Sequence, residues 1–156
     1  MKPITAIIET PKGSAYKYDY DEKLKCIKLN KVLPAGLIFP YDFGFITGTK
    51  GEDGDPLDIM VISEITCFPG CAMDCRIIGA IKVEQTERDG KSMRNDRYFA
   101  VPVVSHTFKA INDIDQLPDG LLDELITFFK TYNDQAGKKF KVLERVHAET
   151  AYTMIG

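Results

Sequence analysis

Hydrophobic and polar residues alternate in short stretches over the first two thirds of the chain. Tyr16-Lys17-Tyr18-Asp19-Tyr20 is the clearest case, since a β-strand sends successive side chains to opposite faces and Lys17 and Asp19 therefore share one face. Similar stretches follow, each ended by a turn rich in glycine, proline or aspartate. The pattern predicts strands within residues 4–9, 16–20, 26–29, 37–46, 58–62, 75–83 and 98–104.

The pattern changes near residue 119 to the spacing of an α-helix. Apolar residues recur every three or four positions over residues 121–132, and Gly137 can end the helix. We expect a core-facing helix of about four turns and a short second helix over residues 148–155. Asp89-Gly90 predicts the tip of a charged hairpin over residues 84–96. Many short strands followed by late helices predict a small β-barrel with helices added behind it.

The composition indicates one globular domain that covers residues 1–156. Its 44% hydrophobic and 28% charged residues are ordinary for a soluble protein. The longest apolar runs are too short to cross a membrane, and Glu9 comes too early for the apolar region of a signal peptide, so we expect a cytoplasmic protein without a membrane partner. The net charge of −3 argues against a nucleic-acid partner, because phosphate backbones select basic surfaces.

The cysteines and histidines form no recognisable catalytic or metal-binding motif. Cys67, Cys71 and Cys75 are evenly spaced, but zinc sites usually combine two such ligands with a distant second pair. We interpret the cysteines as structural or incidental. His106 and His147 are too isolated for a nucleophilic triad, and we interpret them as surface or helix-flanking residues.

The candidate chemistry is concentrated in the acidic segment Glu52-Asp53-Gly54-Asp55-Pro56-Leu57-Asp58, which contains four carboxylates and no basic side chain. Carboxylates this close repel one another unless a cation lies between them. Gly54 and Pro56 impose an irregular backbone, and the apolar run after Asp58 places that carboxylate at the mouth of a buried strand. Such oxygen ligands suit Mg2+. The alternative is a solvated acidic turn.

The same segment, followed by its aliphatic run, resembles the signature of the soluble family I inorganic pyrophosphatases. Ile8-Glu9-Thr10-Pro11, Tyr16-Lys17-Tyr18-Asp19 and residues 39–46 resemble further family motifs in the same order. The resemblance extends over residues 4–155. It implies an OB-like five-stranded β-barrel flanked by helices (α+β, mainly β), and dependence on Mg2+, with Mn2+ or other divalent cations as alternatives. It also implies a cytoplasmic homo-oligomer, with a hexamer favoured.

The resemblance also implies roles for the matching residues. Asp55 matches the aspartate that activates the attacking water. The expected metal-binding residues are Asp53, Asp58, Glu9 and Asn95, the last standing where the family has an aspartate. The expected substrate-binding residues are Lys17, Lys31, Arg97 and Tyr132. Such a set is chemically sensible, since metal ions activate water and basic groups neutralise the leaving phosphate.

Several residues depart from the family pattern. Gln85 and Asn95 stand where the family has acids, so we expect fewer or weaker Mg2+ sites. Lys31 replaces an arginine and exchanges a bidentate phosphate contact for a point charge. Substitute ligands can come from the charged hairpin, whose acidic residues include Glu84, Glu87, Asp89 and Asp96. Further departures are Asp19, Phe43, Arg97, Asn133, Thr127 and Thr131.

The sequence thus predicts an enzyme that hydrolyses inorganic pyrophosphate to two phosphates by metal-activated water. A second hypothesis is a pyrophosphatase-like homologue with weakened or lost activity, or one that acts on another phosphoanhydride. A third is an OB-like module that binds nucleic acid by stacking bases on aromatic side chains, against which the acidic segment argues. The rate, the number of metal ions and the number of subunits stay open.

Overall fold

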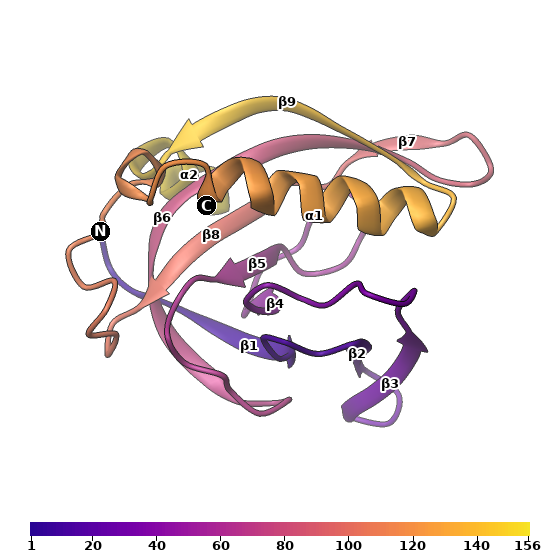
Figure 1. Cartoon of the computed structure of the whole chain (residues 1–156), viewed down its shortest axis with the longest axis horizontal. Helices are drawn as coiled ribbons and strands as arrows, with labels where there is room; N and C mark the ends of the chain where they lie inside the picture. Colours follow the sequence, from indigo (N-terminus) through magenta and orange to yellow (C-terminus); the bar gives the residue numbers. More distant parts are fainter.

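Five strands close into a barrel in the computed structural model, which describes residues 1–156 (Figure 1). They are β1 (Ile4–Thr10), β4 (Asp42–Ile46), β5 (Asp58–Val61), β6 (Ala72–Thr86) and β8 (Arg97–Pro102). They pair in the order β1-β4-β5-β8-β6, and β6 returns to pair with β1. Closure removes the free sheet edges. It confirms the predicted fold class, an OB-like five-stranded barrel with flanking helices.

Four further strands extend or accompany the barrel. β6 continues past it and pairs on its two edges with β7 (Ser92–Arg94) and β9 (Lys139–His147). β2 (Tyr16–Asp21) and β3 (Cys26–Val32) form a separate hairpin, which confirms the strands predicted within residues 16–20 and 26–29. This hairpin lies at the same end of the molecule as β7 and the C-terminal end of α1 (Leu121–Gln135) (Figure 1).

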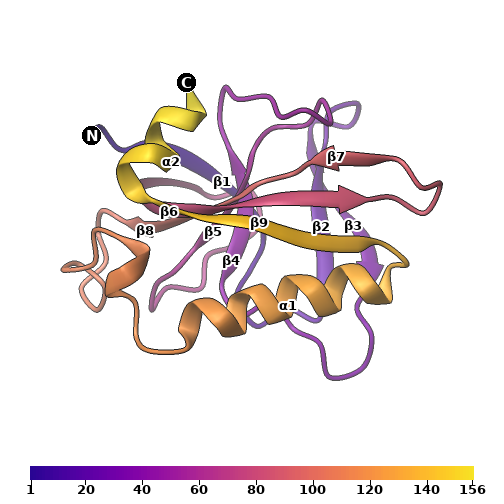
Figure 2. The same cartoon turned by 90° about the horizontal axis from the view of Figure 1, so that it is seen from above.

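Two α-helices and one short 3-10 helix complete the fold. α1 lies alongside β9, as seen from above in Figure 2, and confirms the amphipathic helix predicted there. α2 (Ala148–Ile155) packs against β6 at the other end of the molecule and matches the predicted short helix. η1 (Ile114–Gln116) precedes α1. No helix is long and apolar enough to cross a membrane.

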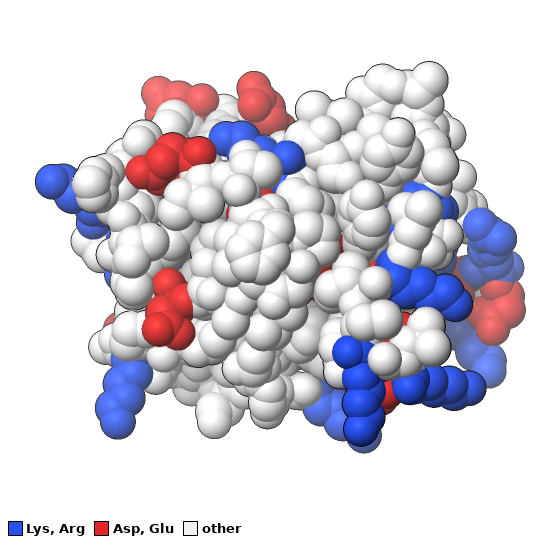
Figure 3. All heavy atoms as spheres, turned by 90° about the horizontal axis from the view of Figure 1, so that it is seen from below, with Lys and Arg blue, Asp and Glu red and all other residues white.

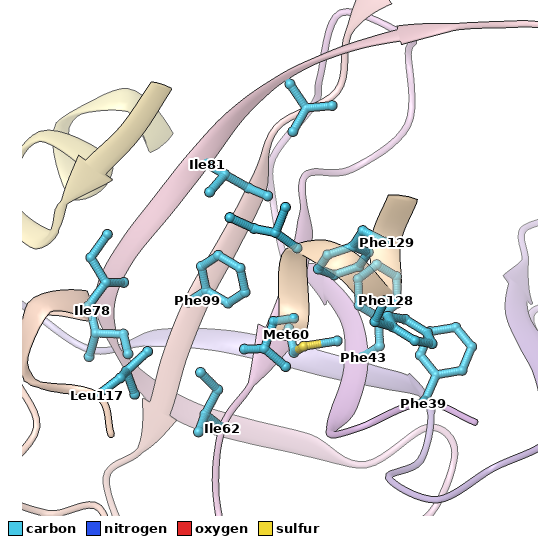
Figure 4. Packing of buried hydrophobic residues seen from close by; sticks show 14 of the residues in the cluster. Phe39, Phe43, Met60, Ile62, Ile78, Ile81, Phe99, Leu117, Phe128 and Phe129 are labelled. Atoms are coloured by element: carbon cyan, nitrogen blue, oxygen red, sulfur yellow. The ribbon is translucent and has the colours of Figure 1, made fainter. Parts of the chain in front are cut away.

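A cluster of aromatic side chains fastens α1 to the barrel. The ring centroids of Phe39 and Phe128 are 5.0 Å apart, and those of Phe43 and Phe129 are 5.8 Å apart. Figure 4 shows these four rings packed together beside Met60. Because aromatic pairs at such distances pack favourably, the C-terminal half of α1 is held in place over the barrel mouth.

The structure differs from the sequence-based expectations in two places, and it also decides which face of β2 turns inward. β9 was not predicted, because its side chains are mostly exposed and its hydrophobic signal is weak. Residues 37–46 form a strand only from Asp42 onward, since Pro40 has no N–H for a ladder. In β2 the side chains of Tyr16 and Tyr20 are exposed, whereas Lys17 is largely buried, so the charged face of this strand turns inward.

Candidate active site

A cavity of about 770 Å³ opens between the barrel, the β2–β3 hairpin and the C-terminal end of α1. Its lining includes all nine residues to which the family resemblance gives a catalytic, metal-binding or substrate-binding role: Glu9, Lys17, Lys31, Asp53, Asp55, Asp58, Asn95, Arg97 and Tyr132. These residues come from strands, a loop and a helix that are distant in sequence. The fold therefore brings the predicted site residues together. The cysteines and histidines do not line this cavity.

Three of the carboxylates that line the cavity form no ion pair. Asp53 and Asp55 belong to the loop before β5, where Asp53 Oδ1 accepts the Asp55 N–H at 3.0 Å. Glu9 is buried at the end of β1 and accepts the Tyr20 N–H at 2.7 Å. Because lysines and arginines leave Glu9, Asp53 and Asp55 unpaired, their negative charge is available to a cation from solution.

The pKa values of the acidic groups reflect this environment. Burial raises the pKa of Glu9 to about 7. Burial and the neighbouring Asp53 charge raise the pKa of Asp55. Burial also raises the pKa of Asp58, although Arg97 and Lys17 oppose the shift. A bound cation stabilises the ionised form of a carboxylate, so cation binding at these groups would release protons.

Basic side chains line the same cavity, and the charge of Lys17 acts on both Glu9 and Asp58. Lys17 forms an ion pair with Asp19, and the Lys31 Nζ lies 4.6 Å from the centroid of the Tyr132 ring. Burial alone lowers the pKa of Lys17, but Asp19 raises it overall. Burial and the charges of Lys17 and Lys138 lower the pKa of Lys31. Figure 3 shows lysines and arginines gathered at the end of the molecule that carries β2 and β3. The basic groups in the cavity are suited to binding an anion.

Arg97 lies at the base of the cavity with its side chain only 7% exposed. Its Nη1 lies 2.9 Å from Asp58 Oδ2 and donates to the Asn95 carbonyl at 2.8 Å, while Nη2 donates to Gln85 Oε1 at 3.3 Å. Gln85 Oε1 also accepts the Asn95 side-chain amide at 3.2 Å. Gln85 and Asn95, which stand where the family pattern has acids, therefore both lie against the buried guanidinium of Arg97.

The charged hairpin contributes one acidic residue to the cavity. Glu87 lines it, accepts the Gln85 amide at 2.9 Å and forms an ion pair with Lys138 at 3.1 Å. Asp96, by contrast, accepts the Val83 N–H and pairs with Arg94. Of the suggested substitute ligands, Glu84, Asp89 and Asp96 do not line the cavity. Lys138 was not predicted, and its only sequence signal is its place after the glycine that ends α1.

The donor set of the cavity fits a hard divalent cation, since Glu9, Asp53 and Asp55 offer unpaired carboxylate oxygens. The carboxylate oxygens of the three aspartates in the acidic segment do not all lie within 4.8 Å of one another, so the aspartates do not form a preassembled metal site. That spacing occurs at Asp113, Asp115 and His147, outside the cavity.

Asp113 has a structural explanation at that outer grouping. It accepts the Ala148 N–H at the start of α2 and the Asp115 N–H at η1. Both are helix-capping hydrogen bonds, which side-chain oxygens commonly accept at helix N-termini. The unpaired carboxylates in the cavity are therefore the better place for a cation.

Comparisons with known proteins agree with this chemistry. A profile of the family described as inorganic pyrophosphatase matches residues 6–156. The inorganic pyrophosphatase of Halalkalibacterium halodurans is 40% identical over 155 residues, which cover 99% of this chain and 91% of that protein. The solved structure of inorganic pyrophosphatase from Thermus thermophilus superposes with a TM-score of 0.88 at 34% identity, covering 99% of this chain and 87% of the other. The inorganic pyrophosphatase from Helicobacter pylori gives a TM-score of 0.88 at 29% identity, covering 99% and 89%.

Proposed function

Because this chain belongs to the inorganic pyrophosphatase family, we propose that it hydrolyses inorganic pyrophosphate to two phosphates with the help of Mg2+. The observation that carries the proposal is one cavity that is lined both by unpaired carboxylates and by basic groups. A phosphoanhydride carries negative charge throughout, so it needs basic groups for binding. A cation held by the carboxylates would supply further charge neutralisation.

The proposed cation ligands are Asp53, Asp58 and Glu9, with the side-chain amide oxygen of Asn95 as a neutral donor. When bound, a divalent cation lowers the pKa of a water molecule and polarises the phosphate oxygens. Glu9 is fixed for its part by the hydrogen bond from Tyr20. The irregular backbone around Gly54, at a φ of +88°, keeps the acidic loop in its turn.

Asp55 is the proposed general base. Its raised pKa makes its carboxylate a better proton acceptor than an ordinary aspartate, and its exposed position leaves room for a water molecule. The Asp53 side chain, which accepts the Asp55 N–H, holds the backbone at this position. Asp55 would take the proton of the attacking water as the phosphorus–oxygen bond forms.

The basic groups of the cavity would bind the two phosphates. Asp19 orients the Lys17 ammonium, and the Tyr132 ring supports the Lys31 ammonium. Lys31, whose pKa is lowered, can also give a proton to the leaving phosphate more readily than an ordinary lysine. Arg97, at the base of the cavity, is the third basic group proposed to bind phosphate. Fixed positive charges at these positions would stabilise the charge that grows on the leaving group.

One observation favours the second hypothesis, a homologue with weakened activity. Two amides, Gln85 and Asn95, and the Arg97–Asp58 ion pair lie at the base of the cavity, where added carboxylates would strengthen a metal site. This arrangement predicts a larger Mg2+ requirement than a fully acidic site would have.

Phosphate release from pyrophosphate tests the proposal, with Mg2+, with Mn2+, and with EDTA in place of metal. Tripolyphosphate and nucleoside triphosphates in parallel define the substrate range. The matched control is Asp55→Asn, which keeps size and removes the base. We expect metal-dependent release by the parent and strong loss in the variant. Release no faster than that of the variant would contradict the proposal and leave the weakened homologue.

We propose, on the family resemblance, that the chain acts in the cytoplasm as a homo-oligomer, with a hexamer favoured. Thr127 and Thr131 of α1 are exposed on the single chain, so this face of the helix is available to contact another subunit. Light scattering after size-exclusion chromatography measures the subunit number. A monomer at micromolar concentration would contradict this expectation.

A further inference from the structure

The acidic loop (residues 47–57) connects two neighbouring strands of the barrel. β4 ends at Ile46, β5 begins at Asp58, and the two strands pair antiparallel. The Ile46 N–H donates to the Leu57 carbonyl at 2.9 Å, so the chain leaves β4 and enters β5 at the same place. Between these two ends no strand ladder holds the chain. Other contacts must therefore fix the carboxylates that the loop carries.

The Thr49 hydroxyl joins the two ends of the loop. Its Oγ1 donates to the Ile46 carbonyl at 2.7 Å and accepts the Leu57 N–H at 3.0 Å. A hydroxyl has one proton to donate and lone pairs that accept, so a single side chain makes both bonds. Thr49 is half-buried and does not line the cavity. Any effect of Thr49 on the chemistry of the cavity is therefore exerted through the loop.

The tip of the loop is connected to the segment that Thr49 holds. The Gly51 N–H donates to the Asp55 carbonyl at 2.6 Å, and the Gly54 N–H donates to the Gly51 carbonyl at 3.0 Å. Asp53 Oδ1 in turn accepts the Asp55 N–H. Gly51 follows Thr49 by two residues, so the place of the two carboxylates in the cavity depends on where Thr49 holds the chain.

Thr47 of the same loop provides a comparison. Its Oγ1 donates to the Thr5 carbonyl at 3.1 Å, which attaches the start of the loop to β1, and it makes no hydrogen bond to the end of the loop. Removal of this hydroxyl leaves the Leu57 N–H paired. Removal of the Thr49 hydroxyl takes away the acceptor of that N–H, and a partly buried N–H without an acceptor is unfavourable. Only Thr49 therefore joins the start of the loop to its end.

Given the metal-dependent hydrolysis proposed above, we propose that Thr49 is a positioning residue for the cation and for the attacking water. Its hydroxyl holds the acidic loop closed, so that the carboxylates of Asp53 and Asp55 stay near Asp58 at the start of β5. Loss of the hydroxyl frees the loop to take other conformations. The cation ligands and the base are then no longer held in one arrangement.

Steady-state kinetics of phosphate release over a range of Mg2+ concentrations tests the proposal. We expect Thr49→Val, which keeps the shape and removes the hydroxyl, to need on the order of tenfold more Mg2+ and to lower kcat by on the order of tenfold, the scale seen when a residue that orients metal ligands is lost. The KM for pyrophosphate at saturating Mg2+ should stay near the parental value, because Lys17, Lys31 and Arg97 lie outside the loop.

Two further variants separate the hydroxyl from the mere presence of threonine. Thr49→Ser keeps the hydroxyl and should restore the parental Mg2+ requirement and kcat. Thr47→Val is the matched control, since it also removes one threonine hydroxyl that donates to a backbone carbonyl, and it should keep both values. Parental kinetics in Thr49→Val, or equal losses in Thr49→Val and Thr49→Ser, would overturn the proposal.

Metal binding without substrate gives a second measurement. Calorimetric titration with Mg2+ should show weaker binding in Thr49→Val than in Thr47→Val and the parent, and equal affinities would overturn the proposal. This difference does not depend on turnover, so a failure here is distinguishable from a failure to hydrolyse pyrophosphate. Circular dichroism checks folding. Thr49→Ala removes the same hydroxyl without placing a methyl group against the Ile46 carbonyl, and it replaces Thr49→Val where that variant is unfolded. Unfolding of both would make Thr49 a residue of the fold alone and overturn the proposal.

Discussion

Two regions of the molecule neutralise their carboxylates in opposite ways. Outside the cavity, Glu64 accepts hydrogen bonds from the Ser105 hydroxyl at 2.6 Å, the His106 N–H at 2.8 Å and the Thr107 N–H at 3.0 Å. These donors lower the pKa of Glu64 to about 2. In the cavity, Glu9 accepts a single backbone N–H, from Tyr20, and burial raises its pKa to about 7.

The difference separates acids that hold the fold from acids that are available for chemistry. A structural carboxylate such as Glu64 has its charge distributed over donors that the chain itself provides. The cavity carboxylates are partly removed from water but accept few hydrogen bonds from the chain. A cation from solution binds well under this condition, because it stabilises the ionised carboxylates. Asp58 stands between the two groups, since it faces the cavity and yet has Arg97 as a partner.

The strongest test of this comparison is the proposed base. Asp55→Asn should lower turnover of pyrophosphate by at least about a hundredfold, the usual scale for loss of a general base, while folding and metal binding stay nearly intact. Phosphate release at saturating Mg2+ measures the effect. Glu64→Gln is the matched control outside the cavity, and it should keep the parental rate. Near-parental turnover by Asp55→Asn would remove Asp55 from the mechanism.

Opposite pH dependences should follow from the two environments. The folded-state pKa of Glu9 is raised from 4.5 to about 7, so the stability it contributes is complete below pH 4.5 and is lost as pH rises through 7. The metal-free parent should therefore lose on the order of 2 kcal/mol relative to Glu9→Gln between pH 4.5 and 7. Lys17, Asp19 and Asp58 face Glu9, and their charges are already part of its shift.

Glu64 gives the reverse sign. Its folded-state pKa is lowered, so its contribution is complete above pH 4.5 and disappears as pH falls toward 2. Urea unfolding in EDTA between pH 2 and pH 7 compares the free energy of unfolding of Glu9→Gln and Glu64→Gln with that of the parent. Adding Mg2+ at pH 7 should reduce the loss of stability that Glu9 causes in the parent. Parallel pH profiles for the parent and Glu9→Gln would show that Glu9 is not desolvated.

Restoring acids at the base of the cavity should sharpen the comparison further. Gln85→Asp with Asn95→Asp adds two carboxylates beside Arg97, so the double variant should bind one more Mg2+ per chain and hydrolyse pyrophosphate up to about tenfold faster at equal metal concentration. Without metal it should be less stable than the parent because the added charges repel Asp58. Equal stoichiometry and equal rate would mean that Glu87 already fills this role, or that these positions lie outside the metal site.

Sequence alone predicted the barrel and most of its elements, since alternation and turn residues are local signals. The acidic segment was also visible by itself, because four carboxylates without a basic neighbour are unusual. Only the family resemblance placed Glu9 and Lys17 in the same site as the acidic segment. Residue spacing along the chain does not predict that β1 and β2 lie beside the loop before β5.

The base of the cavity lay beyond sequence reasoning for a physical reason. The contact of Arg97 with Asp58 depends on the parallel register of β5 and β8, and that of Lys138 with Glu87 depends on how the chain enters β9. Register is a property of paired strands, and it cannot be taken from one strand's pattern. The departures at Gln85 and Asn95 were visible, but their common partner was not.

The smallest expected effect concerns Asp113, whose oxygens accept the Ala148 N–H at 3.0 Å and the Asp115 N–H at 3.1 Å. Asp113→Ala removes these caps and should lower the free energy of unfolding by about 1 kcal/mol. Mg2+ stoichiometry and the rate of phosphate release should stay at the parental values, because a structural acid is neutralised by the chain's own donors. Asp89→Ala is the control for loss of one exposed carboxylate together with one local backbone hydrogen bond, since Asp89 Oδ1 accepts the Lys91 N–H at 2.9 Å. Loss of a bound ion in Asp113→Ala would instead show that Asp113, Asp115 and His147 form a metal site. Hydrogen bonds from backbone N–H groups would then no longer distinguish structural carboxylates from those that bind metal.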